Sequence, residues 1–258
     1  MLDSSLMDNK ERAIANITMF TAVYLGRASM LLFVVFLFAG SLGLVELGYS
    51  EATVLLWDGL LSLLFFVQHS GMIRRGFRAG LSRLVPPHYI EAVFSLVSSV
   101  LLIAIVLFWQ SSVTNLIELE GLARWAARGV FLLGMAGLAW GVLTLKSIDP
   151  FGAKAIKNYL KQRQRQPQQF QAKGPYVWVR HPLYFFLILL IWSCPDLTAD
   201  RLLFNVLWTA WIYLGTVWEE RDLVADFGED YRAYQKQVPM LLPWKIPART
   251  GQASSDVS

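Results

Sequence analysis

The chain has 258 residues, of which 55% are hydrophobic and only 16% are charged. Soluble domains average about 25% charged residues, so this composition, with a mean hydropathy of +0.44, indicates a membrane protein and excludes an ordinary soluble enzyme. The net charge of +4 comes without a basic face interleaved with aromatic residues, which argues against a nucleic-acid partner. One cysteine, and three histidines without zinc-binding spacing, predict no disulfide within the chain and no metal site.

Six apolar segments predict an all-α fold, an integral membrane helical bundle. A helix of about 20 apolar residues crosses a hydrocarbon core of roughly 30 Å. The segments cover residues 17–44, 52–70, 90–109, 124–145, 183–195 and 199–218. The fifth is too short to span alone and Pro195 interrupts it, so segments five and six are expected to form a helical hairpin.

Basic residues are distributed unevenly among the loops. They precede the first segment and follow the second and fourth, whereas the loops at 45–51 and 110–123 contain no lysine or arginine. By the positive-inside rule we expect both termini on the cytoplasmic side, in a bacterial inner membrane. Arg124, Arg128 and Arg201 count against this orientation, but they are outnumbered.

The residues after segment six predict an amphipathic helix. Leu223, Phe227, Tyr231 and Tyr234 recur at helical spacing and form one apolar face, which is expected against the bundle or on the cytoplasmic leaflet. Gly228 at its centre predicts a kink or a cap, because glycine weakens a helix interior.

The domain organisation follows from this pattern. No internal repeat divides the chain, so it is interpreted as a single membrane domain. Its parts are a four-helix part at 1–145, a C-terminal cofactor-binding part at 146–244 and a polar tail at 245–258.

The first polar motif, Arg180-His181-Pro182, stands where a basic loop meets segment five. Pro182 suits the first turn of a helix, and the free N–H groups there attract a carboxylate beside Arg180 and His181. Tyr184 lies three residues past His181, on the same helical face. Arginine and tyrosine also anchor helix ends at the membrane surface, and the triplet alone favours that simpler interpretation.

Three further motifs fall on the same predicted face of the membrane. Glu219-Glu220 ends segment six, where a carboxylate marks a function or pairs with a cation, although acids also favour the start of a helix. Gln68-His69-Ser70 ends segment two, and 149–152 follows segment four; each alone indicates only a helix stop or a turn. Their shared location favours one site.

Taken in order, these motifs resemble a known family. The C-terminal signature of membrane methyltransferases related to isoprenylcysteine carboxyl methyltransferase and phospholipid methyltransferases is similar to Arg180-His181-Pro182-x-Tyr184, Glu219-Glu220-x-x-Leu223, Phe227-Gly228-x-x-Tyr231-x-x-Tyr234 and Val238-Pro239. The earlier part of the chain is more similar to the methanethiol S-methyltransferase branch, with a general likeness to NnrU-type membrane proteins, through Gln68-His69-Ser70-Gly71-Met72 and Phe108-Trp109-Gln110. It departs from that branch near Ser147, where a histidine is expected, and this leaves the methyl acceptor open.

The resemblance implies S-adenosylmethionine as the cofactor, contacted by His181, Tyr184 and one of Glu219 or Glu220. Arg180, beside the helix start at Pro182, is a candidate for the methionyl carboxylate. Aromatic rings suited to adenine or to the sulfonium belong to Tyr176, Trp178 and Tyr231. For catalysis, Arg180 or His181 is expected to favour a thiolate, and His69 is a candidate proton acceptor.

The leading interpretation is a membrane methyltransferase that converts a small thiol such as methanethiol to a thioether such as dimethyl sulfide. Alternative acceptors are an isoprenylcysteine-like carboxylate and a lipid amine, whose long tails need a lateral opening between helices. An alternative from a different functional class is a non-catalytic, NnrU-like membrane protein. The expected partners are a small thiol or lipophilic substrate and membrane lipids, and the oligomeric state stays open.

Overall fold

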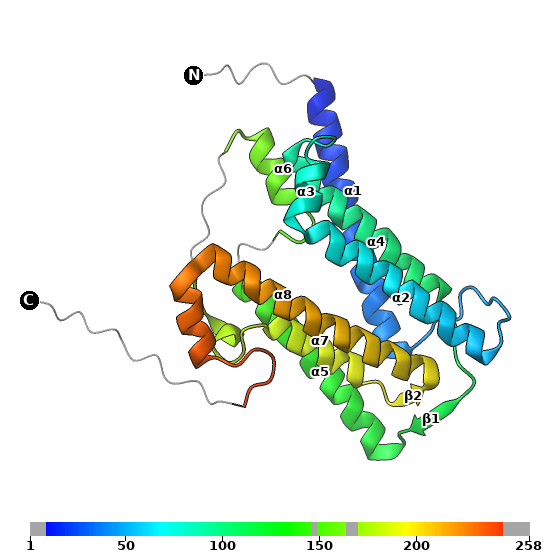
Figure 1. Cartoon of the computed structure of the whole chain (residues 1–258). Helices are drawn as coiled ribbons and strands as arrows, with labels where there is room; N and C mark the ends of the chain where they lie inside the picture. The colour runs from blue at the N-terminus through cyan, green and yellow to red at the C-terminus, as the bar shows by residue number, and fades with distance from the viewer. Residues whose placement is uncertain (1–8, 146–148, 164–169, 245–258) are drawn as a thin grey trace, which may run out of the picture.

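A computed structural model describes residues 9–145, 149–163 and 170–244. The first part of the chain contains α1 (Asn9–Ala39), α2 (Glu51–Ile73), α3 (Arg75–Leu81), η1 (Pro87–Tyr89), α4 (Ile90–Phe108) and β1 (Asn115–Glu118). The second part contains α5 (Gly121–Thr144), α6 (Ala153–Leu160), η2 (Gly174–Val177), α7 (Pro182–Trp192), β2 (Asp196–Thr198) and α8 (Ala199–Gln237). Long helices lying side by side make up most of the molecule (Figure 1), which confirms the predicted all-α bundle.

Four helices within the described residues are long and apolar enough to cross a membrane: α1, α2, α4 together with η1, and α5. They match the first four predicted segments. The expected hairpin is also present, because α7 is followed by the short strand β2 and then by α8, which packs against α7. With eleven residues, α7 is too short to span alone, as predicted.

Three predicted boundaries are wrong. The first segment was expected at 17–44, but α1 begins at Asn9, and it ends at Ala39 because Gly40 takes a left-handed conformation with φ of +87°. Segment six and the amphipathic helix were expected as separate elements, yet both lie within α8. The predicted kink at Gly228 is confirmed, since this residue has non-helical angles of φ 59° and ψ −130° inside α8.

The helices pack mainly within each part of the chain, and α2 and α8 join the two parts. Helix α1 lies on α4, α2 contacts both α4 and α8, and α5 lies on α7. The close α5–α7 contact depends on small residues, because a side chain at Gly137 would collide with the ring of Phe186. Aromatic rings dominate the core, where Phe36, Trp109 and Phe204 meet edge to face.

The two ends of the bundle differ in what they carry. The far end holds β1 and β2, which pair antiparallel with Glu118 opposite Asp196, and the buried Arg201, whose guanidinium donates to the last carbonyls of α1. The opposite end, called the site end below, holds the start of α7 and the second half of α8 (Figure 1). The predicted motifs gather at the site end.

Candidate functional site

The start of α7 is held by residues 238–240, which follow directly after α8. The backbone N–H of Arg180 donates to the carbonyl of Pro239 at 2.9 Å, and that of His181 donates to the carbonyl of Met240 at 3.1 Å. The Arg180 guanidinium adds a bond of 2.6 Å to the carbonyl of Val238. Pro182 begins α7, as predicted, because its missing N–H costs nothing at that position. The site end is therefore clasped by residues 238–240.

Glu220 is the centre of a buried hydrogen-bond network, called the hub below. Its Oε1 accepts from Arg180 Nε at 2.8 Å, from His181 Nε2 at 2.7 Å and from the Tyr231 hydroxyl at 2.8 Å. Its Oε2 accepts from the amide of Gln235. The Glu220 side chain is only 10% exposed, so it makes its bonds within the protein. The hub joins α7 to both halves of α8.

The hub holds a carboxylate that stays ionised. Burial raises the pKa of Glu220, but the hydrogen bonds from His181, Arg180, Gln235 and Tyr231 outweigh it and lower the pKa to about 2. Burial and the bond to Glu220 raise the pKa of Tyr231, so its phenol remains a donor at neutral pH. With its acceptor positions filled, Glu220 has little capacity left for a ligand.

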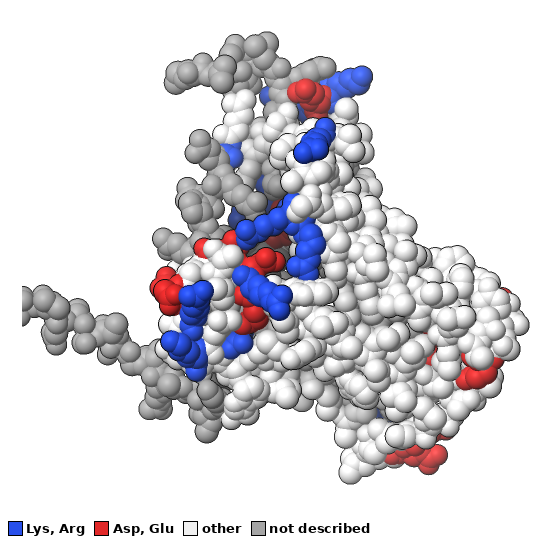
Figure 2. All heavy atoms as spheres, in the orientation of Figure 1, with Lys and Arg blue, Asp and Glu red and all other residues white. Residues whose placement is uncertain are grey.

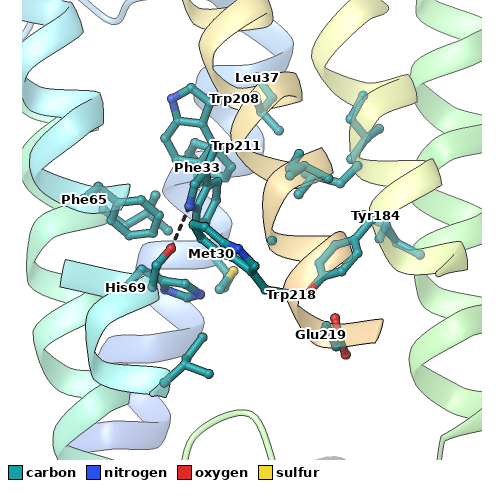
Figure 3. Close-up of a pocket in the computed structure, with 18 of the residues that line it drawn as sticks. Met30, Phe33, Leu37, Phe65, His69, Tyr184, Trp208, Trp211, Trp218 and Glu219 are labelled. Atoms are coloured by element: carbon teal, nitrogen blue, oxygen red, sulfur yellow. Dashed lines mark hydrogen bonds between the residues drawn. The ribbon is translucent and has the colours of Figure 1, made fainter. Parts of the chain in front are cut away.

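Glu219, the adjacent residue, faces a cavity of about 430 Å³ between α1, α2, α7 and α8. Its Oε2 is buried, and no described residue donates a hydrogen bond to it. The imidazole Nδ1 of His181 lies 3.7 Å from it. Tyr184 lines the same wall and stacks on the His181 ring at 5.7 Å (Figure 3). A buried, unpaired carboxylate oxygen is costly, so this one is suited to a ligand that donates to it.

His69 lines the opposite wall of the cavity, across from Tyr184 and Glu219 (Figure 3). Its ring is packed against Phe65 at 5.2 Å and Trp211 at 5.3 Å. Its Nδ1 lies 3.5 Å from the hydroxyl of Ser98, which also accepts from the Gln68 amide at 3.2 Å. Among the described residues no hydrogen bond reaches Nε2. Packing and Ser98 thus hold the ring in place and leave one nitrogen for the cavity.

The mouth of the cavity is charged, whereas its walls are apolar. Arg74 and Asp222 line the mouth, and the Arg74 guanidinium lies 4.5 Å from the centre of the Trp218 ring. An exposed ion pair between Arg75 and Asp226 joins α3 to α8 nearby. Figure 2 shows charged side chains gathered around this end, while the broad flank of the bundle is nearly free of charge. Such a flank is suited to lipid.

The predicted site residues thus form two groups. Tyr184, Glu219 and His69 line the cavity, whereas Arg180, His181 and Tyr231 belong to the hub behind it. Tyr176 lies in η2 and joins the hub side, because its carbonyl accepts from the Tyr234 hydroxyl. Trp178 packs edge to face on Trp140 and is not among the cavity residues.

The motif at 149–152 has a structural role. The Asp149 carboxylate accepts from the N–H groups of Lys154 and Ala155 at the start of α6, and Gly152 has no room for a side chain against the backbone of Ala92. Ser147, where the sequence departs from the related branch, lies outside the described residues.

Sequence reasoning missed several residues of the site. They are Arg74, Ser98, Trp211, Trp218, Asp222 and Gln235. A signal existed for those on α8, because Trp208, Trp211, Gly215, Trp218 and Asp222 recur every three or four residues and form one stripe. Ser98 and Gln235 carry no such signal, because only the packing of helices brings them to the site.

Comparison with known proteins gives curated relatives along most of the chain. A methanethiol S-methyltransferase of Pseudomonas sp. (strain GM41(2012)) is 35% identical over 201 residues, which is 76% of this chain and 76% of the relative. One from Mycobacterium tuberculosis is 35% identical over 183 residues, 70% of this chain and 74% of the relative. Methanethiol S-methyltransferase 1 of Bradyrhizobium diazoefficiens is 31% identical over 201 residues, 76% of this chain and 69% of the relative.

No family model matches the chain, and no solved structure is similar to it. Nevertheless, each aligned region covers more than two thirds of this chain and more than two thirds of the relative. It agrees with the ordered motifs and with the membrane bundle. The chain belongs to the methanethiol S-methyltransferase family of membrane methyltransferases.

Proposed function

We propose that the protein transfers a methyl group from S-adenosylmethionine to a small thiol such as methanethiol, giving a thioether and S-adenosylhomocysteine. One observation carries the proposal: His69 and the unpaired Glu219 Oε2 face one apolar cavity, in a chain whose relatives bear the name of this activity. An apolar cavity with few polar groups is typical of a small-molecule site.

The cavity residues fit the proposed donor. S-adenosylmethionine carries an ammonium group and ribose hydroxyls, and Glu219 Oε2 needs a donor of that kind. Asp222, one turn later on α8, adds a second carboxylate at the mouth, and Arg74 offers a cation for the methionyl carboxylate. Tyr184 and Trp218 supply rings for adenine or for the sulfonium.

The hub is proposed to act through position. Arg180, His181 and Tyr231 bind Glu220, and this fixes the part of α8 from which Glu219 projects. Tyr176 and Pro182 hold the start of α7, so that Tyr184 is presented to the cavity. Of the residues predicted from the family signature, Glu219 and Tyr184 are thus the proposed direct contacts.

When bound, S-adenosylmethionine supplies a methyl group on a positively charged sulfur. The chemistry that it would supply is transfer of this methyl group to the acceptor thiolate, with the electrons of the old S–C bond going to the donor sulfur. His69 Nε2 accepts the thiol proton and later releases it to water. The rings of Phe65 and Trp211 beside His69 exclude water, which favours attack on the methyl donor by the thiolate over attack by water.

The site end is proposed to face the cytoplasm of a bacterium, with both ends of the chain on that side of the inner membrane. The basic loops after α2 and α5 support this orientation. The donor then reaches the mouth from the cytoplasm, where Arg74 and Asp222 lie. A membrane-permeant acceptor such as methanethiol reaches the cavity from either water or lipid.

A direct assay tests the proposal. Purified protein in detergent is incubated with methyl-labelled S-adenosylmethionine and, separately, with methanethiol, an isoprenylcysteine and phosphatidylethanolamine. Labelled dimethyl sulfide with methanethiol is the expected result. Label in a methyl ester or a lipid amine would move the function to the alternative acceptors. Failure to bind S-adenosylhomocysteine in calorimetry would leave the non-catalytic membrane protein as the interpretation.

A further inference from the structure

The cavity continues well beyond the level of His69. On α8 its lining runs from Asp222 at the mouth to Trp208, which at about 1.5 Å per residue is about 20 Å. The inner part, called the deep chamber below, is formed by Phe33, Leu37, Phe65, Leu102, Leu190 and Trp208. Figure 3 shows Leu37 and Trp208 at the end opposite Glu219.

The deep chamber offers no free polar group from these residues. Each of the six side chains is at most 6% exposed, and five of them carry only carbon and hydrogen. The indole N–H of the sixth, Trp208, donates a hydrogen bond to the hydroxyl of Ser62 at 3.3 Å. The ring of Trp208 is stacked on Phe65 at 5.3 Å and tilted against Phe33 at 5.0 Å. A ligand group in the chamber therefore meets hydrocarbon and ring faces.

In-line methyl transfer determines which part of the acceptor enters this chamber. The attacking sulfur lies on the side of the methyl group opposite the leaving sulfur. The groups that suit the donor's charges, Glu219 and Asp222, lie toward the mouth, so the acceptor lies on the inner side. With its sulfur beside His69, the acceptor directs its carbon substituent toward Phe33 and Leu37.

We propose that the deep chamber is a binding site for the carbon chain of the acceptor, so that the substrate class comprises unbranched alkanethiols longer than methanethiol. This inference rests on the proposed function. Each buried methylene improves binding by about three- to fourfold, as apolar burial does elsewhere. A terminal hydroxyl in the same place loses its water without gaining a partner, which reduces kcat/KM by at least about tenfold.

The test measures kcat/KM for methanethiol, ethanethiol, 1-propanethiol and 1-butanethiol with purified protein and S-adenosylmethionine, with the thioether quantified by gas chromatography. 3-Mercapto-1-propanol is the matched polar acceptor, because a hydroxyl replaces the last methyl of 1-butanethiol. We expect kcat/KM to rise along the alkane series and to fall at least about tenfold from 1-butanethiol to the alcohol.

A pair of variants links the result to the chamber. Val34 lines the cavity on α1, whereas Val35 beside it is 42% exposed on the outer surface. Val34→Phe is expected to reduce kcat/KM for 1-butanethiol at least tenfold relative to methanethiol, as expected from loss of the space for two or more methylenes. Val35→Phe is expected to leave the ratio of the two substrates unchanged.

The outcomes separate this inference from the proposed function. Turnover of methanethiol with little or none of 1-butanethiol overturns the chain-binding chamber and leaves the thiol methyltransferase standing. An equal rate for 1-butanethiol and its hydroxyl analogue, or the same substrate ratio in Val34→Phe and the parent protein, also overturns it. If no thiol at all is methylated while the protein binds S-adenosylhomocysteine, the proposed function fails first.

Discussion

The hub and the cavity lie side by side along α8, yet the acidic residue of each differs in how many hydrogen bonds it accepts. Glu220 is buried with four hydrogen-bond donors, whereas Glu219 has a buried oxygen that no described residue satisfies. The hub is built almost entirely from the last third of the chain, and the cavity needs α1 and α2 as well. From this difference we expect that Glu220 maintains the fold and that Glu219 is available to a ligand.

The largest expected effect comes from removing the centre of the hub. Glu220→Ala leaves Arg180 and His181 buried without their carboxylate, which costs about 3–5 kcal/mol in the free energy of unfolding. Thermal unfolding in detergent measures the loss. The matched control is Glu229→Ala, because the Glu229 side chain is 81% exposed and its ion-pair partner among the described residues is the exposed Arg232. This variant should change stability by less than about 0.5 kcal/mol. Equal stability in both variants would contradict a structural role for Glu220.

The same carboxylate predicts a dependence of stability on pH. Its pKa of about 2 in the folded protein lies below the ordinary value of 4.5, so its contribution is complete above 4.5 and is lost as the pH falls toward 2. Unfolding in denaturant between pH 6 and about 3 should show the parent protein weakening more steeply than Glu220→Gln. Parallel curves would show that the hub does not hold Glu220 ionised.

On the cavity side, His69→Asn should lower kcat by about a hundredfold, because a general base contributes at least that much. Asparagine has a similar size and keeps a polar group near Ser98, so binding of S-adenosylhomocysteine and thermal stability should remain close to the parent values. Calorimetry and melting provide these controls. A parent-like kcat in His69→Asn would remove the proposed proton acceptor and leave the cavity with a positioning role only.

Glu219→Gln tests the other half of the comparison. Replacing the charged acceptor should weaken binding of S-adenosylhomocysteine by about ten- to a hundredfold, as expected for loss of a hydrogen bond to a charged group. The melting temperature should change far less than in Glu220→Ala, because Glu219 Oε2 accepts no hydrogen bond from a described residue. If stability falls and affinity does not, the roles of the two carboxylates are reversed.

The smallest expected effect belongs to Ser98, which contacts His69 without lining the cavity. Ser98→Ala should reduce kcat by about three- to tenfold, since one neutral hydrogen bond is lost, and should leave KM unchanged. Ser98→Thr, which keeps the hydroxyl, should restore most of the rate. A shift of the pH–rate profile in Ser98→Ala but not in Ser98→Thr would distinguish positioning of the imidazole from a packing defect.

Much of the fold could be predicted, because membrane-spanning helices appear in the sequence as blocks of apolar residues. The starts of α2 and α4 fall within one residue of their predicted positions, and Pro182 correctly marked the start of α7. The end of α1 was misplaced, since the residues after Gly40 are still partly apolar although they lie outside the helix. Segment six was predicted to end at Trp218 because charged residues follow it. The helix α8 continues past that point, because charge alone does not end a helix.

The residues of the candidate site could be proposed from the sequence, but the sequence could not divide them between the hub and the cavity. Adjacent residues on a helix point about 100° apart, so one of Glu219 and Glu220 had to face away from the cavity. Which of them does so depends on how α8 is rotated against α2 and α7, and the packing of three helices decides that. The position of His69 across from Glu219 depends on the same packing.

The clasp made by residues 238–240 bears on the order in which the site end can be completed. These residues follow every described helix along the chain, since α8 ends at Gln237. The start of α7 receives its last backbone bonds only from these residues. We therefore expect a chain cut before residue 238 to keep the helices of the bundle while the start of α7 lacks these two backbone bonds.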